Sequence, residues 1–205
     1  MRFKNVKVYG LDESITRSGY PMRVGEPLNM NHPGIALHEV VNLDTDIQRA
    51  EKLAKVKTGT GHDNFMKGII VQFDMQYPEY FSPQLQRYNW IDIVSSQSKM
   101  HKITSRNLTK NDFIPNVSLA FIDTLNKYIY GYNNTKDSIQ KSEFFKNIIA
   151  NLPSGYLKWM GISTNYLQLK TIYQQRKNHK LDEWKAFCRW VKTLPMSNLI
   201  TDGSK

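Results

Sequence analysis

The clearest hydrophobic pattern in this chain lies between residues 67 and 77, where apolar side chains occupy every second position. These positions are Ile69, Val71, Phe73, Met75 and Tyr77. A period of two is typical of a β-strand with one face on a core. Pro78 has no amide hydrogen to donate, so we predict that the strand ends there. Ser82-Pro83 then indicates the start of a short helix, and a polar loop is expected at Ser95–Ser98.

Most other apolar residues recur with the 3.6-residue period of amphipathic helices. We expect these helices to begin where a polar side chain can cap them. The expected starts are Asp44-Thr45, Asn111 or Asp112, Ser142, and one of Ser163, Thr164 and Asn165, and a last helix covers 181–193. Residues 3–9 are expected to form a strand, and 156–162 a strand or an extended link.

A single domain covering residues 1–205 is the expected organisation, because a chain of this length can bury a sizeable core. Turn-forming triplets, Gly-Tyr-Pro, Gly-Glu-Pro and His-Pro-Gly, predict an irregular arm or loop over residues 10–42. Residues 196–205 are expected to be a loose tail.

The formal net charge of +10 favours an anionic partner, which can be a nucleotide, a nucleic acid or an acidic surface. Cys188 is the only cysteine, so no disulfide can form within the chain and a reducing, cytoplasmic location is expected. No apolar run approaches the ~20 residues of a membrane span, and no membrane partner is expected.

Several familiar chemistries have no support in the sequence. The five histidines show no metal-ligand spacing, so no metal site is predicted, and neither a nucleophile elbow nor a Walker loop is present. Cys188 lies on an apolar helical stripe, which favours inert packing. The glycines of Thr58–His62 could bring backbone amides close to a phosphate, but their spacing fits a plain turn better than any phosphate-binding fingerprint.

Arg176 is the most unusual residue in the helical patterns. The helix expected over 166–176 carries an apolar stripe at Tyr166, Leu169, Ile172 and Tyr173, and Arg176 is the next position on it. A guanidinium left buried and unpaired would cost several kcal/mol. Two interpretations stay open, which are an internal salt bridge to an acid and a clamp for a phosphate.

Two blocks of residues, far apart in the sequence, carry one shared pattern. The first block covers roughly 58–101 and carries Gly61-His62, Ile69, Phe73, Pro78, Gln84 and Arg87. The second covers 150–186 and carries Leu152-Pro153, Asn165, Leu169, Arg176 and Trp184. Together the two blocks resemble the flavin-dependent thymidylate synthases, whose spacing they match without gaps within the first block and through Arg176 in the second.

The resemblance implies an α/β (α+β) fold in which helices flank a central, mostly antiparallel sheet. It also implies a homotetramer that holds FAD between subunits. In that family a methyl group passes from methylenetetrahydrofolate to carbon 5 of dUMP, reduced flavin carries the hydride, and NADPH supplies the electrons.

The resemblance also assigns roles to individual residues. Arg176 would bind dUMP and, with Ser98, belong to the catalytic centre. The expected flavin positions are His62, Arg87, Tyr88, Asn89, Asn165 and Thr171. The expected nucleotide positions, besides Arg176, are Ser96, Gln97, Ser98, Lys99 and Lys146.

The chain departs from the family at several of these positions. Tyr88-Asn89 replaces a His-Arg pair, Asp92 replaces a serine, and Gln97 and Lys99-Met100 replace the Ser and Arg-Tyr of the dUMP loop. A second dUMP arginine becomes Ile149, with Lys146 one turn away as a substitute. An enzyme acting on dUMP or a related pyrimidine nucleotide is therefore weighed against a binding module of the same fold, which holds a nucleic acid or a protein. A structural or inhibitory protein of viral type is the third hypothesis.

Overall fold

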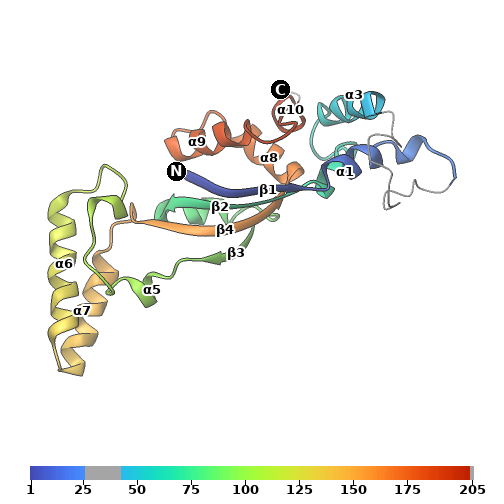
Figure 1. Cartoon of the computed structure of the whole chain (residues 1–205). Helices are drawn as coiled ribbons and strands as arrows, with labels where there is room; N and C mark the ends of the chain where they lie inside the picture. The colour runs from blue at the N-terminus through green and yellow to red at the C-terminus, as the bar shows by residue number, and fades with distance from the viewer. Residues whose placement is uncertain (26–42, 204–205) are drawn as a thin grey trace.

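A four-stranded antiparallel sheet forms the centre of the computed structural model, which describes residues 1–25 and 43–203. Its strands are β1 (Arg2–Tyr9), β2 (Ile70–Pro78), β3 (Asp92–Ser96) and β4 (Leu157–Asn165), in the spatial order β1-β2-β4-β3. Every neighbouring pair is antiparallel. The predicted fold class, helices around an antiparallel sheet, is therefore confirmed (Figure 1).

One face of the sheet is covered by helices α8 (Tyr166–Arg176), α9 (Asp182–Val191) and α10 (Asn198–Thr201) (Figure 1). The alternation of β2 creates this core, because Val71, Phe73, Met75 and Tyr77 are all almost completely buried. Gln72 and Asp74, between them, are exposed or half-buried on the opposite face. We call that opposite side the open face of the sheet.

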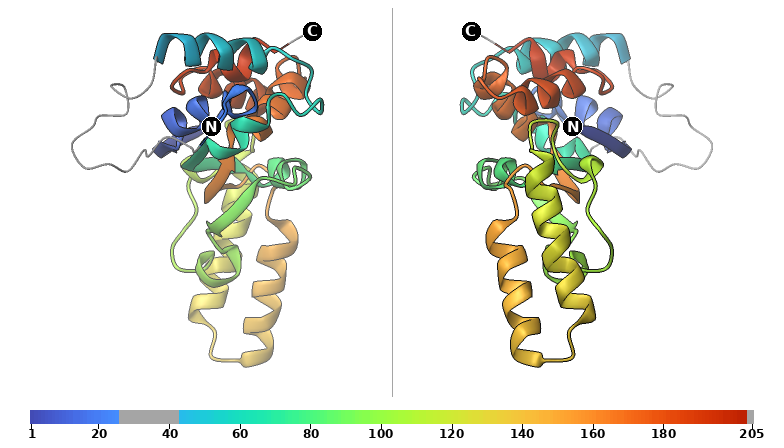
Figure 2. Two further views of the ribbon diagram at one scale, coloured as in Figure 1. Left: turned by 90° about the vertical axis from the view of Figure 1, so that its right-hand side faces the viewer. Right: turned by 90° about the vertical axis from the view of Figure 1, so that its left-hand side faces the viewer.

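A helical hairpin, α6 (Leu119–Asn134) and α7 (Ser138–Asn151), extends away from the sheet (Figures 1 and 2). It has its own apolar cluster, formed by Ile103, Leu108, Phe113, Ile122, Leu125, Ile129 and Ile148. Gly131 lets the two helices approach closely, since a Cβ added there would lie 2.5 Å from the Phe144 ring. Ser118 and Asp137 cap the two helices by accepting hydrogen bonds from backbone amides.

The remaining elements are short except for one helix. They are α1 (Leu11–Arg17), η1 (Tyr20–Met22), α3 (Leu43–Ala54), η2 (Asn64–Gly68), η3 (Glu79–Phe81), α4 (Ser82–Leu85), α5 (Lys99–Lys102) and η4 (Lys110–Asp112). Within the described part of the chain no helix is long and apolar enough to cross a membrane.

Several expectations about the elements were wrong. Residues 11–17 of the expected irregular arm form α1, and residues 26–42 of that arm lie outside the described residues. The expected loose tail contains α10, where Leu199 and Ile200 are fully buried. The expected polar loop Ser95–Ser98 instead begins as part of β3.

Helix starts were also misplaced where the sequence offered several polar caps. The helix expected from Asn111 or Asp112 begins at Leu119, and the one expected from Ser142 begins at Ser138. Ser82 lies inside α4 instead of capping it. The predicted α8 is correct at both ends, and Asn165 caps it by accepting a hydrogen bond from the Gln168 amide at 2.9 Å.

A buried ion pair fastens the segment after α3 to helix α8. The Lys170 ammonium donates to Asp63 Oδ2 at 2.7 Å and to the Val56 carbonyl at 2.8 Å. Both charged side chains are essentially inaccessible to solvent, with exposed fractions of 0% and 1%. Burial makes either charge costly without its partner, so the pair fixes this segment against α8.

We predict that Lys170→Met lowers the free energy of unfolding by roughly 3–5 kcal/mol, because it leaves the Asp63 carboxylate buried and unpaired. Urea unfolding followed by circular dichroism measures the change. Lys177→Ala, at an exposed position just after the same helix, is the control and should change little. The double variant Lys170→Met, Asp63→Leu should regain most of the loss; a single variant as stable as the original chain would contradict the role assigned to the pair.

Candidate functional site

A cavity of about 390 Å³, here called cavity 1, lies between the end of β3 and the base of the helical hairpin. The segment that joins β3 to α5 forms one wall, the loop after α5 a second, and the start of β4 a third. Among its lining residues are Gln97, Ser98, Lys99, Lys102, Arg106 and Lys158. The cavity therefore contains three of the five positions expected to bind a nucleotide besides Arg176.

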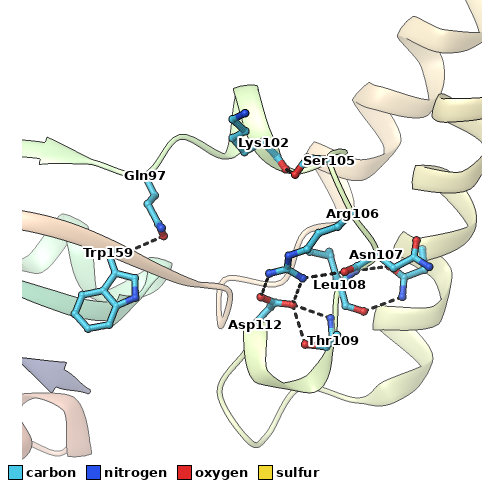
Figure 3. A network of polar contacts seen from close by, with 10 residues as sticks. Gln97, Lys102, Ser105, Arg106, Asn107, Leu108, Thr109, Asp112 and Trp159 are labelled. Carbon is cyan, nitrogen blue, oxygen red and sulfur yellow. Dashed lines mark hydrogen bonds and ion pairs between the residues drawn. The ribbon is translucent and has the colours of Figure 1, made fainter.

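Pairing with β4 holds the Gln97 segment in place (Figure 3). The Gln97 amide donates to the Trp159 carbonyl at 2.9 Å, and the Trp159 amide donates to Gln97 Oε1 at 3.0 Å. The Gln97 side chain thus replaces a backbone acceptor and extends the strand pairing beyond β3. Ser98 follows at the start of α5, where its hydroxyl lies 2.9 Å from His101 Nδ1.

Positive charge exceeds negative charge around cavity 1. Lys99 and Lys158 share one carboxylate, with Nζ atoms 2.7 and 3.5 Å from Glu79 Oε1. Arg106 pairs with Asp112, and the Lys102 ammonium has no hydrogen-bond partner among the described residues. Four cations against two carboxylates leave a local excess of positive charge, which favours an anionic ligand.

Arg106 is positioned by the most extensive polar network near the cavity (Figure 3). Its guanidinium makes two bonds to the Asp112 carboxylate, at 2.5 and 2.9 Å. Asp112 also accepts from the Thr109 amide and hydroxyl, completing a capping box. The hydrogen bonds from Arg106 are the main cause that lowers the pKa of Asp112, although partial burial opposes them. The same bonds raise the pKa of Arg106.

A second site of interest, cavity 3, measures about 350 Å³ and lies between the 58–67 segment and the start of α8. Asn165 and Thr171, two of the expected flavin positions, line it together with Trp90. Both use their side chains internally, since Asn165 caps α8 and Thr171 donates to the Leu167 carbonyl at 3.2 Å. Thr58 also lines the cavity, and its hydroxyl oxygen is buried without a hydrogen-bond partner among the described residues.

Arg176 lies on the helix-covered side of the sheet, and its environment matches neither interpretation in full. Its Nε donates to the Tyr88 hydroxyl at 2.7 Å, and its guanidinium lies 4.6 Å from the centre of the Trp184 ring. None of the ion pairs in the described part of the chain involves Arg176. Arg176 therefore has no intramolecular salt bridge there. Its guanidinium is held by neutral groups, which are the face of the Trp184 ring and the Tyr88 hydroxyl.

The other expected positions stand apart from these groups. His62, Arg87, Asn89 and Lys146 are exposed, and none of their side chains has a hydrogen bond or ion pair to a described residue. Ser96 lies on β3, and Tyr88 contacts Arg176. The structure thus brings Gln97, Ser98 and Lys99 together in one place, Asn165 and Thr171 in another, and Tyr88 with Arg176 in a third.

Three cations of cavity 1, Lys102, Arg106 and Lys158, were not among the residues expected from the sequence. Arg106 had a detectable signal, because Thr109–Asp112 fits the spacing of a capping box and marks a fixed carboxylate six residues away. Lys102 and Lys158 had none, since their proximity depends on how α5 meets β4. The metal prediction is untested, but the described residues contain no cluster of three or more His, Cys, Asp or Glu that could hold a metal ion.

We predict that Asp112→Asn destabilises the protein by roughly 1–2 kcal/mol at pH 7, because the charge-assisted bonds to Arg106 are lost. A carboxyl group whose pKa is lowered by folding stabilises the folded state above its ordinary value of 3.8. That contribution disappears as the pH falls below this value through the folded-state pKa. Urea unfolding between pH 7 and pH 3 should therefore show the gap between the two proteins closing below pH 4. A gap that is constant with pH would contradict this role.

Comparison with known proteins gives a clear result for the fold alone. No protein-family model matches the chain, and no curated protein sequence matches it significantly. Two solved structures of flavin-dependent thymidylate synthase ThyX from Helicobacter pylori, both with FAD and dUMP, are similar to it. The TM-scores are 0.69 and 0.67 at 13% and 12% sequence identity. The alignments cover 100% of both chains in the first case, and 98% of this chain and 97% of the other in the second. The chain therefore has a thymidylate synthase ThyX-like fold.

Proposed function

We propose that this protein is a divergent flavin-dependent thymidylate synthase-like enzyme, which binds dUMP or a related pyrimidine nucleotide and methylates it reductively with FAD. The observation that carries the proposal is cavity 1, where Lys102, Arg106 and Lys158 join the Gln97–Lys99 segment in the lining. The fold similarity to FAD- and dUMP-bound structures supports the same conclusion.

Cavity 1 is suited to the phosphate of a nucleotide. The Lys102 ammonium is free to form a charge-assisted bond to a phosphate oxygen, and Lys99 can turn toward the phosphate because Lys158 already contacts the same Glu79 oxygen. The Ser98 hydroxyl would add a neutral donor. These residues bind and orient the nucleotide without any covalent bond to the protein.

Cavity 3 fits the ring system of a flavin. Trp90, 57% exposed, provides an aromatic surface at its wall. Lys67, which is exposed, offers a cation at the same cavity. Asn165 and Thr171 would then contact the ring, while the exposed Arg87 guanidinium would meet the FAD phosphates. FAD, when bound, supplies hydride transfer, with NADPH and methylenetetrahydrofolate as co-substrates.

The two cavities lie at opposite ends of the sheet within one chain. Trp159 lines cavity 1 and Asn165 lines cavity 3, and the six residues of extended strand between these nearest β4 positions separate them by roughly 20 Å. A nucleotide and a flavin ring bound in the same copy could not react across that distance. The distance requires at least two copies, and we propose the homotetramer that the resemblance implies, in which the nucleotide on one copy meets the flavin and Arg176 of others.

We predict that the purified protein, incubated with FAD and desalted, retains the flavin absorption band near neutral pH and elutes as a tetramer in light-scattering chromatography. It should bind dUMP in isothermal titration calorimetry. Lys102→Ala should weaken that binding by about tenfold, because one charge-assisted phosphate bond is lost. Lys177→Ala removes an equal charge at an exposed position after α8 and should have little effect. A monomer that retains no flavin would contradict the proposal.

We predict further that Arg176→Gln reduces dUMP affinity with little change in melting temperature, since glutamine keeps a donor near Tyr88 but removes the charge. Tyr88→Phe is the companion variant, because it removes the hydroxyl acceptor and keeps the guanidinium. It should bind dUMP almost as the original protein does. If Arg176→Gln instead lowers the melting temperature and leaves nucleotide binding unchanged, Arg176 is structural.

A further inference from the structure

A further cavity, here called cavity 2, occupies the open face of the sheet beside cavity 1. It measures about 540 Å³, and its lining includes Arg2, Lys4, Asp74, Ser96, Trp159 and Gly161. Gln97 and Trp159 line both cavities, so the two adjoin. We call cavities 1 and 2 together the open-face groove. Cavity 2 has no part in the function proposed above.

Trp159 lies where the two cavities meet. Its half-buried indole has the Arg2 guanidinium 5.8 Å and the Lys4 ammonium 5.6 Å from its ring centre. Both residues are exposed to solvent, and neither forms an ion pair within the described part of the chain; Arg2 Nε donates to Gln76 Oε1 at 2.7 Å, which leaves its other guanidinium nitrogens for a ligand. An aromatic ring flanked by accessible cations is the combination that stacks a nucleic-acid base and contacts the phosphates beside it.

Cations stand at both ends of the groove. Arg2 and Lys4 belong to cavity 2, and Lys99, Lys102, Arg106 and Lys158 belong to cavity 1. The carboxylates near these groups are Asp74, Glu79 and Asp112, and Asp74 accepts a hydrogen bond from the Asn5 amide group. Six cations against three carboxylates leave the groove positive along its length.

The length of the groove exceeds what one nucleotide needs. Leu157 lines cavity 1 and Gly161 lines cavity 2, and four residues of strand separate them by roughly 13 Å. Stacked nucleotides of one strand advance by about 3.4 Å each. A single monophosphate would engage the cations at one end only, whereas a short strand engages both.

We propose that the open-face groove binds single-stranded nucleic acid, with a base stacked on Trp159 and the phosphates on either side contacting the two groups of cations. This goes beyond the nucleotide methylation proposed above, and it requires neither FAD nor a second copy of the chain. A double helix cannot stack a base on the Trp159 ring, because its bases are already stacked and paired inside it.

The test uses fluorescence anisotropy of an end-labelled 12-nucleotide oligothymidylate with the full-length protein and no added flavin. Trp159→Ala should weaken binding by about tenfold through the loss of a stacked base. The control is Tyr130→Ala, since Tyr130 is 69% exposed on α6 and lines neither cavity of the groove; it should change affinity less than twofold. A duplex of the same length should bind more weakly than the single strand.

Charge is tested with a matched pair of double variants. Arg2→Ala, Lys4→Ala should weaken binding and flatten the dependence of log Kd on log salt. Lys52→Ala, Lys177→Ala removes the same charge from exposed positions on α3 and after α8, and it should have a smaller effect on both quantities. Equal losses of affinity in the two double variants, or equal affinity for the duplex and the single strand, would overturn the proposal. Such a result would indicate diffuse attraction by the net charge.

Photo-crosslinking provides a readout that does not depend on a variant folding. An oligonucleotide that carries 5-iodouracil, irradiated with the unmodified protein, should crosslink at Trp159 or at its neighbours in the groove, as mapped by peptide mass spectrometry. Crosslinks found only elsewhere would overturn the proposal. If dUMP binds but the oligonucleotide does not, nucleotide binding stands and the inference about the groove fails.

Discussion

The two-residue period of β4 is the constraint on which the arrangement of this molecule depends. β4 is paired on both sides, with β2 and with β3, so its register cannot shift without breaking two ladders. Met160 and Ile162 are buried under the helices, while Trp159 and Gly161 line the open face. A slip of one residue would exchange these faces, burying the indole and exposing the core. The same register places Asn165 at the strand end, where it caps α8.

The sequence predicted those parts of the fold whose signals are local. β2 has an uninterrupted alternation, and α8 has an apolar stripe with a capping residue, so both could be read directly. β3 could not, because Asp92–Ser96 is a largely exposed edge strand without an alternating apolar set. In α1 the buried residues Ser14, Ile15 and Thr16 are consecutive and mostly polar, so no helical stripe exists. The single turn of α10 is stable through burial of Leu199 and Ile200, which only tertiary packing decides.

The candidate site also has a part that local sequence signals could predict and a part that only the fold brings together. A linear motif could identify Gln97–Lys99, because these residues are consecutive, but the positive charge around them comes from distant segments that meet only in the fold. Arg176 illustrates a different limit. Its place on an apolar stripe indicated a partner, and carboxylate and phosphate were the natural choices for a guanidinium. The structure instead provides the Trp184 ring and the Tyr88 hydroxyl, which a weakly hydrated planar cation accepts. These neutral partners hold the side chain and leave its charge available.

The geometry of the cavities separates the two proposed activities by the number of copies that each requires. Along β4 the nearest residues of cavities 1 and 3 are roughly 20 Å apart, so the proposed chemistry between a nucleotide and a flavin needs at least two chains. Cavities 1 and 2 share Trp159 and Gln97, so a polynucleotide groove is complete in one. The change to Tyr88-Asn89 relative to the thymidylate synthase pattern affects the flavin side of the first arrangement, whereas the changes to Gln97 and Lys99 lie in the groove itself. Lys99 keeps a positive charge there, and the Trp159 indole and the other cations of the groove do not depend on Tyr88-Asn89. Loss of flavin chemistry in this fold would therefore leave the basic, aromatic-lined groove intact, and nucleic-acid binding would still use its positive charge.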